Sequence, residues 1–134
     1  MHEPTSQPFD RLMAQAAPPG TRFGHRQHVH LTWLAVRGYG RTQARLLIED
    51  GIRRTARYQG VPQKFNATIS RAWVEAIAYH FAAMPDATFD EFIAAYPALL
   101  DKRLLTHHYR ATTLASPAAR SGWVPPDLAP FPWA

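Results

Sequence analysis

Apolar residues recur along this chain at the three- and four-residue spacing of amphipathic helices. The first such segment covers about 9–16, where four apolar side chains share one face, and Pro18 and Pro19 end it. A strand would need alternating apolar and polar residues bounded by turn residues, and such runs are nearly absent. The pattern therefore predicts an all-α fold.

Glycine and proline residues divide the rest of the chain into further helical segments. Gly38 and Gly40 end the second helix, and Gly60 with Pro62 ends the third, because glycine favours helix ends and proline cannot continue a helix. We expect a compact bundle of about five helices in a single domain, 1–134. The helices after the first are expected at about 25–37, at 42–58, from within 64–68 to 84, and at 89–96, with one or two further turns near 99–105.

The end of the chain has a different composition from the helical part. Five prolines fall within the last eighteen residues, and Trp123, Phe131 and Trp133 lie among them. Proline leaves little room for regular structure, whereas a disordered tail would be poor in aromatic residues. We therefore expect a helical core at about 9–110 and an extended, ordered C-terminal strap at 111–134, which crosses the bundle or mediates a homodimer.

Composition and charge exclude several kinds of site. The chain has no cysteine, so disulfides and thiolate nucleophiles are excluded, and a metal would need nitrogen and oxygen ligands. The net charge is +5, but the densest arginines, within 41–57, are mixed with Glu49 and Asp50, so nucleic-acid binding is not favoured. The first residues lack the features of a signal peptide, and no apolar run is long enough to cross a bilayer. We expect a soluble, cytoplasmic protein without membrane contact.

Three histidines lie within six residues at the start of the second predicted helix. At about 100° per residue, His25 and His28 share a face, whereas His30 points to the opposite, solvent side. Two imidazoles at this spacing can converge on one metal ion, and each can also carry a proton near neutral pH. The alternative, in which both are hydrogen-bonded structural residues, is equally consistent with the sequence.

A third imidazole lies on the fourth predicted helix. His80 shares an apolar face with Trp73, and this face is expected to meet the helix that carries the histidine pair, His25 and His28. Three neutral imidazoles would suit one divalent transition metal, Zn, Fe, Cu or Ni, with a fourth position left for water or substrate. A single histidine on an apolar face is more often a hydrogen-bonded core residue. Glu75 is expected to pair with Arg71, four residues earlier.

Polar residues at the start of the fourth helix form a second candidate site. Lys64, Asn66 and Thr68 lie where a helix N-terminus offers free backbone N–H groups, and this combination can bind an anionic group of a substrate. Capping of the helix accounts equally well for Asn66 or for Thr68, but it does not require both of them or the lysine. The sequence therefore favours a polar binding corner here.

Three segments resemble a family of short bacterial all-helical proteins to which no activity is assigned. Residues 23–28 match its pattern F-x-H-x-x-H, 64–73 are similar to K-[FY]-[NH]-x-T-[IL]-[ST]-x-A-[WF], and 114–127 contain A-R-x-x-[WF]-V-x-P-D. The resemblance spans most of the chain. It lends no support to a site role for His30, His80 or Glu75. The site positions that it implies are His25, His28, Asn66 and Thr68.

Together these residues favour a small enzyme that acts on a polar or anionic metabolite. His25 and His28 would hold a divalent ion or move a proton, while Lys64, Asn66 and Thr68 would orient the substrate. The alternative is a non-catalytic metal- or ligand-binding accessory protein that dimerises through the aromatic strap. A solvent-open pocket beside the histidines favours the enzyme, and an exposed aromatic patch favours the accessory protein.

Overall fold

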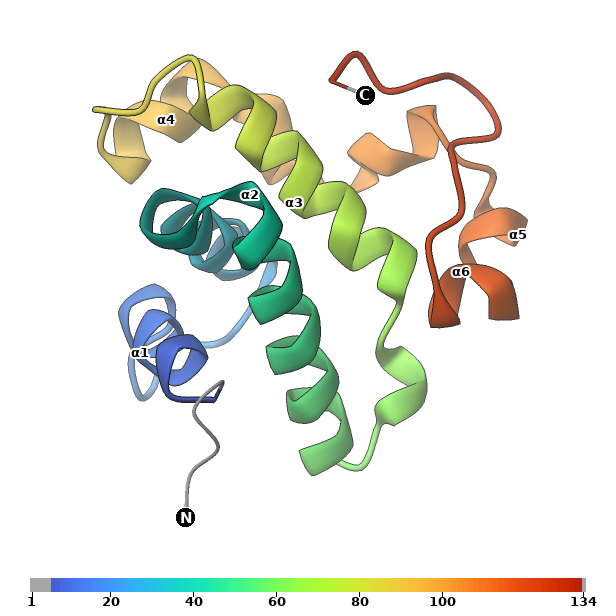
Figure 1. Cartoon of the computed structure of the whole chain (residues 1–134), viewed down its shortest axis with the longest axis horizontal. Helices are drawn as coiled ribbons and strands as arrows, with labels where there is room; N and C mark the ends of the chain where they lie inside the picture. Colours follow the sequence, from blue (N-terminus) through green and yellow to red (C-terminus); the bar gives the residue numbers. More distant parts are fainter. Residues whose placement is uncertain (1–5, 134) are drawn as a thin grey trace.

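Helices account for all the regular structure in residues 6–133, which are the residues that the computed structural model describes. The predicted all-α fold class is therefore confirmed. One short helical turn lies between the second and third of the four longer helices, and the other short turns follow the fourth (Figure 1). The longer helices are α1 (Ser6–Ala16), α2 (His25–Tyr58), α3 (Ala67–Phe81) and α4 (Phe89–Ala95). The turns are the 3-10 helices η1 (Pro62–Lys64), η2 (Pro97–Leu100) and η3 (Lys102–His107), with α5 (Ala111–Leu114) and α6 (Pro117–Ser121).

The second and third predicted helices are joined into one kinked element. Backbone angles stay helical through α2 except at Gly40, where φ is +82° and ψ is 167°. A residue with a side chain is strained at such a φ, whereas glycine adopts it readily. Gly40 therefore produces a kink between two abutting helices, where a separating loop was expected.

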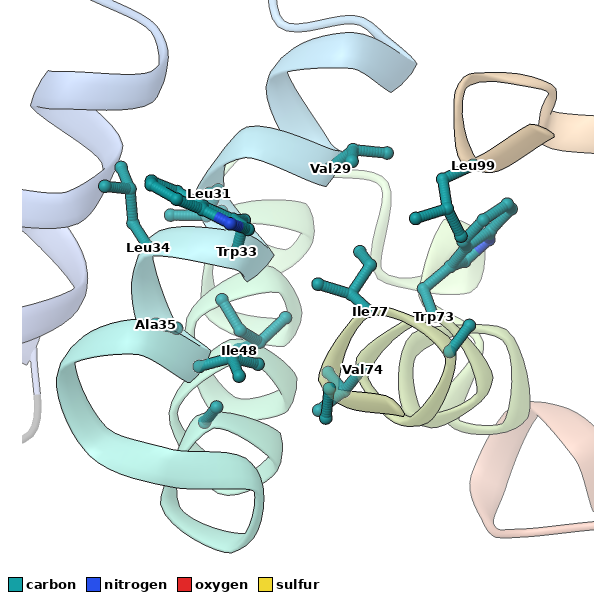
Figure 2. Close-up of a cluster of buried hydrophobic side chains, with 14 of the residues drawn as sticks. Val29, Leu31, Trp33, Leu34, Ala35, Ile48, Trp73, Val74, Ile77 and Leu99 are labelled. Carbon is teal, nitrogen blue, oxygen red and sulfur yellow. The ribbon is translucent and has the colours of Figure 1, made fainter. Parts of the chain in front are cut away.

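The core lies between α2 and α3, which pack along each other (Figure 1). Figure 2 shows Val29 and Ile48 of α2 and Trp73 and Ile77 of α3 contributing to one apolar interior, and Leu99 of η2 covers one end of it. All five side chains are buried. The histidine pair lies on the same stretch of α2 as Val29, so this core holds the candidate site in place.

Helix α1 packs against α2 through one close contact between a ring and a glycine. The Phe9 ring lies directly on Gly51, and a Cβ at that position would overlap the ring. Phe9 is buried by this contact. Glycine is needed at position 51 for its small size, because the backbone of α2 is regular there.

Within the described residues, no helix is both long and apolar enough to cross a membrane.

The C-terminal strap differs from the extended segment that was expected from residue 111. Its first part forms α5 and α6, and only the part from Gly122 onward lacks helix. Ser116 caps α6 by accepting a hydrogen bond from the backbone N–H of Ala119, and Pro117 occupies the first helical position, where its missing N–H costs nothing. Pro117 thus begins a helix, whereas prolines were expected only to interrupt helices in this segment. The strap lies along the side of α3 that faces away from α2 (orange to red in Figure 1).

Candidate functional site

The histidine pair lies in the first turn of α2. The ring centroids of His25 and His28 are 6.2 Å apart and the ring planes are tilted by 34°. Nε2 of His25 donates a hydrogen bond of 2.9 Å to the carbonyl oxygen of Leu99, because a carbonyl can only accept. In the uncharged ring, this bond places the proton on Nε2 and leaves the lone pair on Nδ1.

His28 is neutral at physiological pH because of its surroundings. Burial, with a smaller contribution from the neighbouring His25, lowers the pKa of His28 to about 4. An edge-on contact with the Phe23 ring, at 6.3 Å between centroids, forms part of its apolar surroundings. A proton on His28 would be poorly hydrated in this half-buried position. The pair thus places the uncharged imidazole of His28 beside the ring of His25.

His30 does not point to solvent as the helical wheel predicted. Its ring stacks on Phe89 of α4, with 4.1 Å between centroids and 9° between planes, and the side chain is half-buried. Burial lowers the pKa of His30, and Arg26 and Arg37 act in the same direction. The prediction failed because α4 packs against this side of α2, which the periodicity of α2 alone did not show.

His80 is held in another part of the molecule, against the C-terminal aromatic residues. Its Nδ1–H donates a hydrogen bond of 2.8 Å to the carbonyl oxygen of Ala76, and its ring contacts Tyr96 at 4.5 Å between centroids. Residues 6–133 contain no group of three or more His, Cys, Asp or Glu side chains placed to hold a metal ion. The expected three-histidine arrangement with His25 and His28 is therefore not formed.

The predicted polar corner at the start of α3 is a structural joint. Asn66 caps α3 by accepting a hydrogen bond from the N–H of Ile69 at 2.9 Å, and its amide donates to the carbonyl oxygen of Leu114 at 2.7 Å. Thr68 is 0% exposed; its hydroxyl donates to Gly122 at 2.7 Å and accepts from the N–H of Val124 at 3.0 Å. We call these contacts the strap joint, because each long-range bond attaches the strap.

These bonds occupy polar groups that were predicted to bind a substrate. The Asn66 side chain accepts one hydrogen bond and donates one, and the Thr68 hydroxyl both donates and accepts, so a role in orienting an anion stays a prediction for these residues. Lys64 is exposed at the end of η1, outside the strap joint. Asn66 and Thr68 thus act together in the strap joint, and Lys64 takes no part in it.

Two residues that support the strap were missed from the sequence. Tyr109 is buried, and its hydroxyl donates a hydrogen bond of 2.6 Å to the carbonyl oxygen of Val124; burial raises the pKa of this phenol to about 12. Asp127 accepts hydrogen bonds from the backbone N–H of Arg110 and the hydroxyl of Thr113. The signal for Asp127 was present in the sequence pattern of 119–127, but nothing in that pattern identified its partners.

Two surface grooves lie outside the histidine pair. The larger, about 590 Å³, runs along the second half of α2 beside Pro8 of α1. The smaller, about 430 Å³, lies where the kink of α2 meets the C-terminal half of α3, and we call it the kink groove. Neither is lined by His25 or His28. The residues lining the kink groove are Val36, Gly40, Arg41, Glu75, Ala78, Tyr79, Phe81, Ala82 and Trp133.

Comparison with known proteins gives no match: no family model, no curated protein and no solved structure is significantly similar to this chain. The support for a function therefore comes from the chemistry of the residues described above. Of the two sites expected from the sequence, the histidine pair keeps a ring nitrogen of His25 without a protein partner, whereas in the polar corner Asn66 and Thr68 bind the strap and Lys64 remains exposed.

Proposed function

We propose that the protein binds a divalent transition metal through His25 and His28 and uses the open positions of that ion to act on a small polar or anionic metabolite. The observation that carries this proposal is the state of the two rings. Nε2 of His25 is fixed on the carbonyl oxygen of Leu99, which leaves Nδ1 as a lone-pair donor, and burial keeps His28 neutral.

This arrangement has the chemistry of a metal-binding histidine pair. A metal-ligating histidine usually donates its other N–H to a backbone carbonyl or carboxylate, which orients the ring. Neutral imidazole suits Zn, Cu, Ni and Fe, and two of them supply part of a coordination shell whose other positions go to water or substrate. Such an ion, when bound, polarises a bound oxygen and lowers the pKa of a bound water.

Direct proton transfer by the pair is less well supported. A pKa of about 4 makes His28 a weak base at neutral pH and leaves it almost no proton to donate as an acid. His25 has its Nε2 proton held by Leu99, so only Nδ1 can accept a proton. The metal-dependent form of the enzyme proposal is therefore preferred to the acid-base form.

The second candidate is a non-catalytic metal- or ligand-binding accessory protein. The observation that favours it is the strap joint, in which Asn66 and Thr68 bind the strap with the groups that would have oriented a substrate. In this case the ion or ligand is held and passed on without reaction. Dimerisation through the aromatic strap would belong to this function.

The test begins with metal content and metal affinity of protein purified without an affinity tag. We expect about one equivalent of zinc, nickel or copper to bind, and a His25→Ala/His28→Ala variant to lose it. An exposed histidine, His107, provides the matched control as His107→Ala, which should bind like the unsubstituted protein. Equal binding by the double variant, or none by any of the three proteins, would overturn the proposal.

A cobalt-loaded sample separates the two candidates. Small anions that reach open coordination positions change the visible spectrum of the bound ion, because the geometry around it changes. A clear spectral response to added carboxylates would support the enzyme. A spectrum that no anion changes would indicate a closed shell and favour the accessory protein.

A further inference from the structure

The kink groove contains exposed ring surfaces and charged side chains that the proposed function does not use. It starts at Val36, eight residues beyond His28, which corresponds to about 12 Å along a helix. Its volume of about 430 Å³ lies in the range of small-molecule sites. Three parts of the chain meet there: the bend of α2 at Gly40, the last turns of α3, and Trp133 of the strap.

The acceptors of the groove are engaged by neighbouring cations. Oε2 of Glu75 lies 3.4 Å from Nη1 of Arg41, and Oε1 of the same carboxylate lies 3.8 Å from Nε of Arg71. One carboxylate thus faces two guanidinium groups from two helices. The local charge is positive, so an organic cation would be repelled and an anion attracted.

The donors of the groove, in contrast, are largely unused. The side chain of Arg41 is 63% exposed, and its hydrogen bond to Glu75 engages one of the five N–H groups that a guanidinium carries. Nε1 of Trp133 is buried and has no acceptor among the described residues. A ligand that fits this groove must therefore bring acceptors.

The groove also offers aromatic surface. The Tyr79 side chain is 52% exposed, and its ring centroid lies 6.3 Å from that of Trp133. The Trp133 ring is itself held in place by stacking on Phe131, at 4.7 Å and 16°. A flat ring placed against Tyr79 and Trp133 would cover apolar surface that water now contacts.

We propose that the kink groove binds a small planar aromatic carboxylate. Its ring lies against Tyr79 and Trp133, and its carboxylate accepts hydrogen bonds from the guanidinium of Arg41, a pairing that is bidentate in favourable geometry. This site is distinct from the histidine pair and does not depend on a metal.

Calorimetric titration of the full-length protein with 2-naphthoate tests the proposal. We expect saturable binding of one equivalent, and affinity about tenfold lower or worse in Arg41→Gln, since a hydrogen bond to a charged group is lost. Arg37→Gln is the matched control: Arg37 stacks over the Trp33 ring and does not line the groove, so this variant should bind normally. Circular dichroism of both variants confirms that each is folded.

Two comparisons make the outcome specific. Cyclohexanecarboxylate, which is not planar, and 2-naphthylmethylammonium, which is cationic, should both bind more weakly than 2-naphthoate. The indole N–H resonance that disappears in Trp133→Phe should shift on binding, while those of the other three tryptophans stay in place. Absence of saturable binding at millimolar 2-naphthoate, or equal weakening in Arg37→Gln, would overturn the proposal.

The histidine variant separates this proposal from the proposed function. His25→Ala/His28→Ala should bind 2-naphthoate with unchanged affinity, in the presence or absence of a chelator. Loss of binding in that variant would place the carboxylate at the histidines and contradict the kink groove. Metal binding that fails while 2-naphthoate still binds would contradict only the proposed function.

Discussion

The histidine pair and the strap joint are both clusters of polar residues at helix N-termini, yet they differ in how many of their polar atoms already bind other parts of the protein. In the strap joint, the Asn66 amide and the Thr68 hydroxyl bind backbone groups of the strap. In the histidine pair, one N–H of His25 is bound by Leu99, and its other ring nitrogen remains available. The strap joint holds the strap on α3, whereas the histidine pair keeps a ring nitrogen that can bind a ligand or an ion.

This difference shows what a polar motif needs before it indicates a binding site. Hydrogen-bonding groups that face distant backbone are consumed by folding, because a buried polar group without a partner is costly. Thr68 is the clearest example, since its hydroxyl both donates to Gly122 and accepts from Val124. A motif of the same composition can bind a ligand only where some of its hydrogen-bonding groups have no partner within the protein.

The largest expected effect breaks the strap joint. Thr68→Val keeps the shape of the side chain but leaves the carbonyl of Gly122 and the N–H of Val124, both in half-buried residues, without their partner. We expect the free energy of unfolding to fall by about 3 kcal/mol, measured by urea denaturation. Thr68→Ser keeps the hydroxyl and should lose only about 1 kcal/mol. Equal losses in the two variants would show that the hydroxyl is not what holds the strap.

The next effect concerns the histidine pair and depends on pH. Because the folded-state pKa of His28, about 4, lies below the ordinary value of 6.5, the unfolded chain takes up a proton first as the pH falls. The stability from this residue is complete above pH 6.5 and is lost between there and pH 4. From pH 7 to pH 5 the loss amounts to about 2 kcal/mol.

Substitution isolates this contribution to the pH dependence. His28→Gln should reduce the loss of stability between pH 7 and pH 5, in paired urea denaturation curves. The exposed His107 gives the control, His107→Gln, whose curve should fall as steeply as that of the unsubstituted protein. An unchanged slope in His28→Gln would mean that His28 is not enclosed in the folded protein.

The smallest expected effect tests how the strap joint extends to Tyr109. Tyr109→Phe removes the donor of the 2.6 Å bond to Val124 and should lower the free energy of unfolding by about 1 kcal/mol. Tyr58→Phe, at a side chain that is 95% exposed, should have no measurable effect. Tyr109 and Thr68 bind the two backbone groups of Val124, so losses in the double variant should not add.

Local signals in the sequence predicted the helices well. The first helix ends at Ala16, α2 ends at Tyr58 before Gly60, and α4 begins at Phe89 after the capping residue Thr88, all as expected. These boundaries depend on capping and helix-breaking residues, which act within a few positions of the chain. The predicted ion pair of Glu75 with Arg71 is also present, and Arg41 joins it from α2.

Features that depend on distant contacts could not be predicted in the same way. The stacking of His30 on Phe89 requires knowledge of where α4 lies, and the strap partners of Asn66 and Thr68 are 48 to 56 residues away. For the candidate site, helical spacing placed His25 and His28 together correctly. It could not show that Leu99 would fix one ring or that His80 would lie elsewhere.

The strap joint also sets an order on the folding of a newly made chain. The bonds of Asn66 and Thr68 reach forward to Leu114, Gly122 and Val124. While a ribosome is still adding those residues, the first turn of α3 exists without the partners that complete it. The strap joint can therefore form only after residues 114–124 have been synthesised, so the N-terminus of α3 is completed late in the folding of the chain.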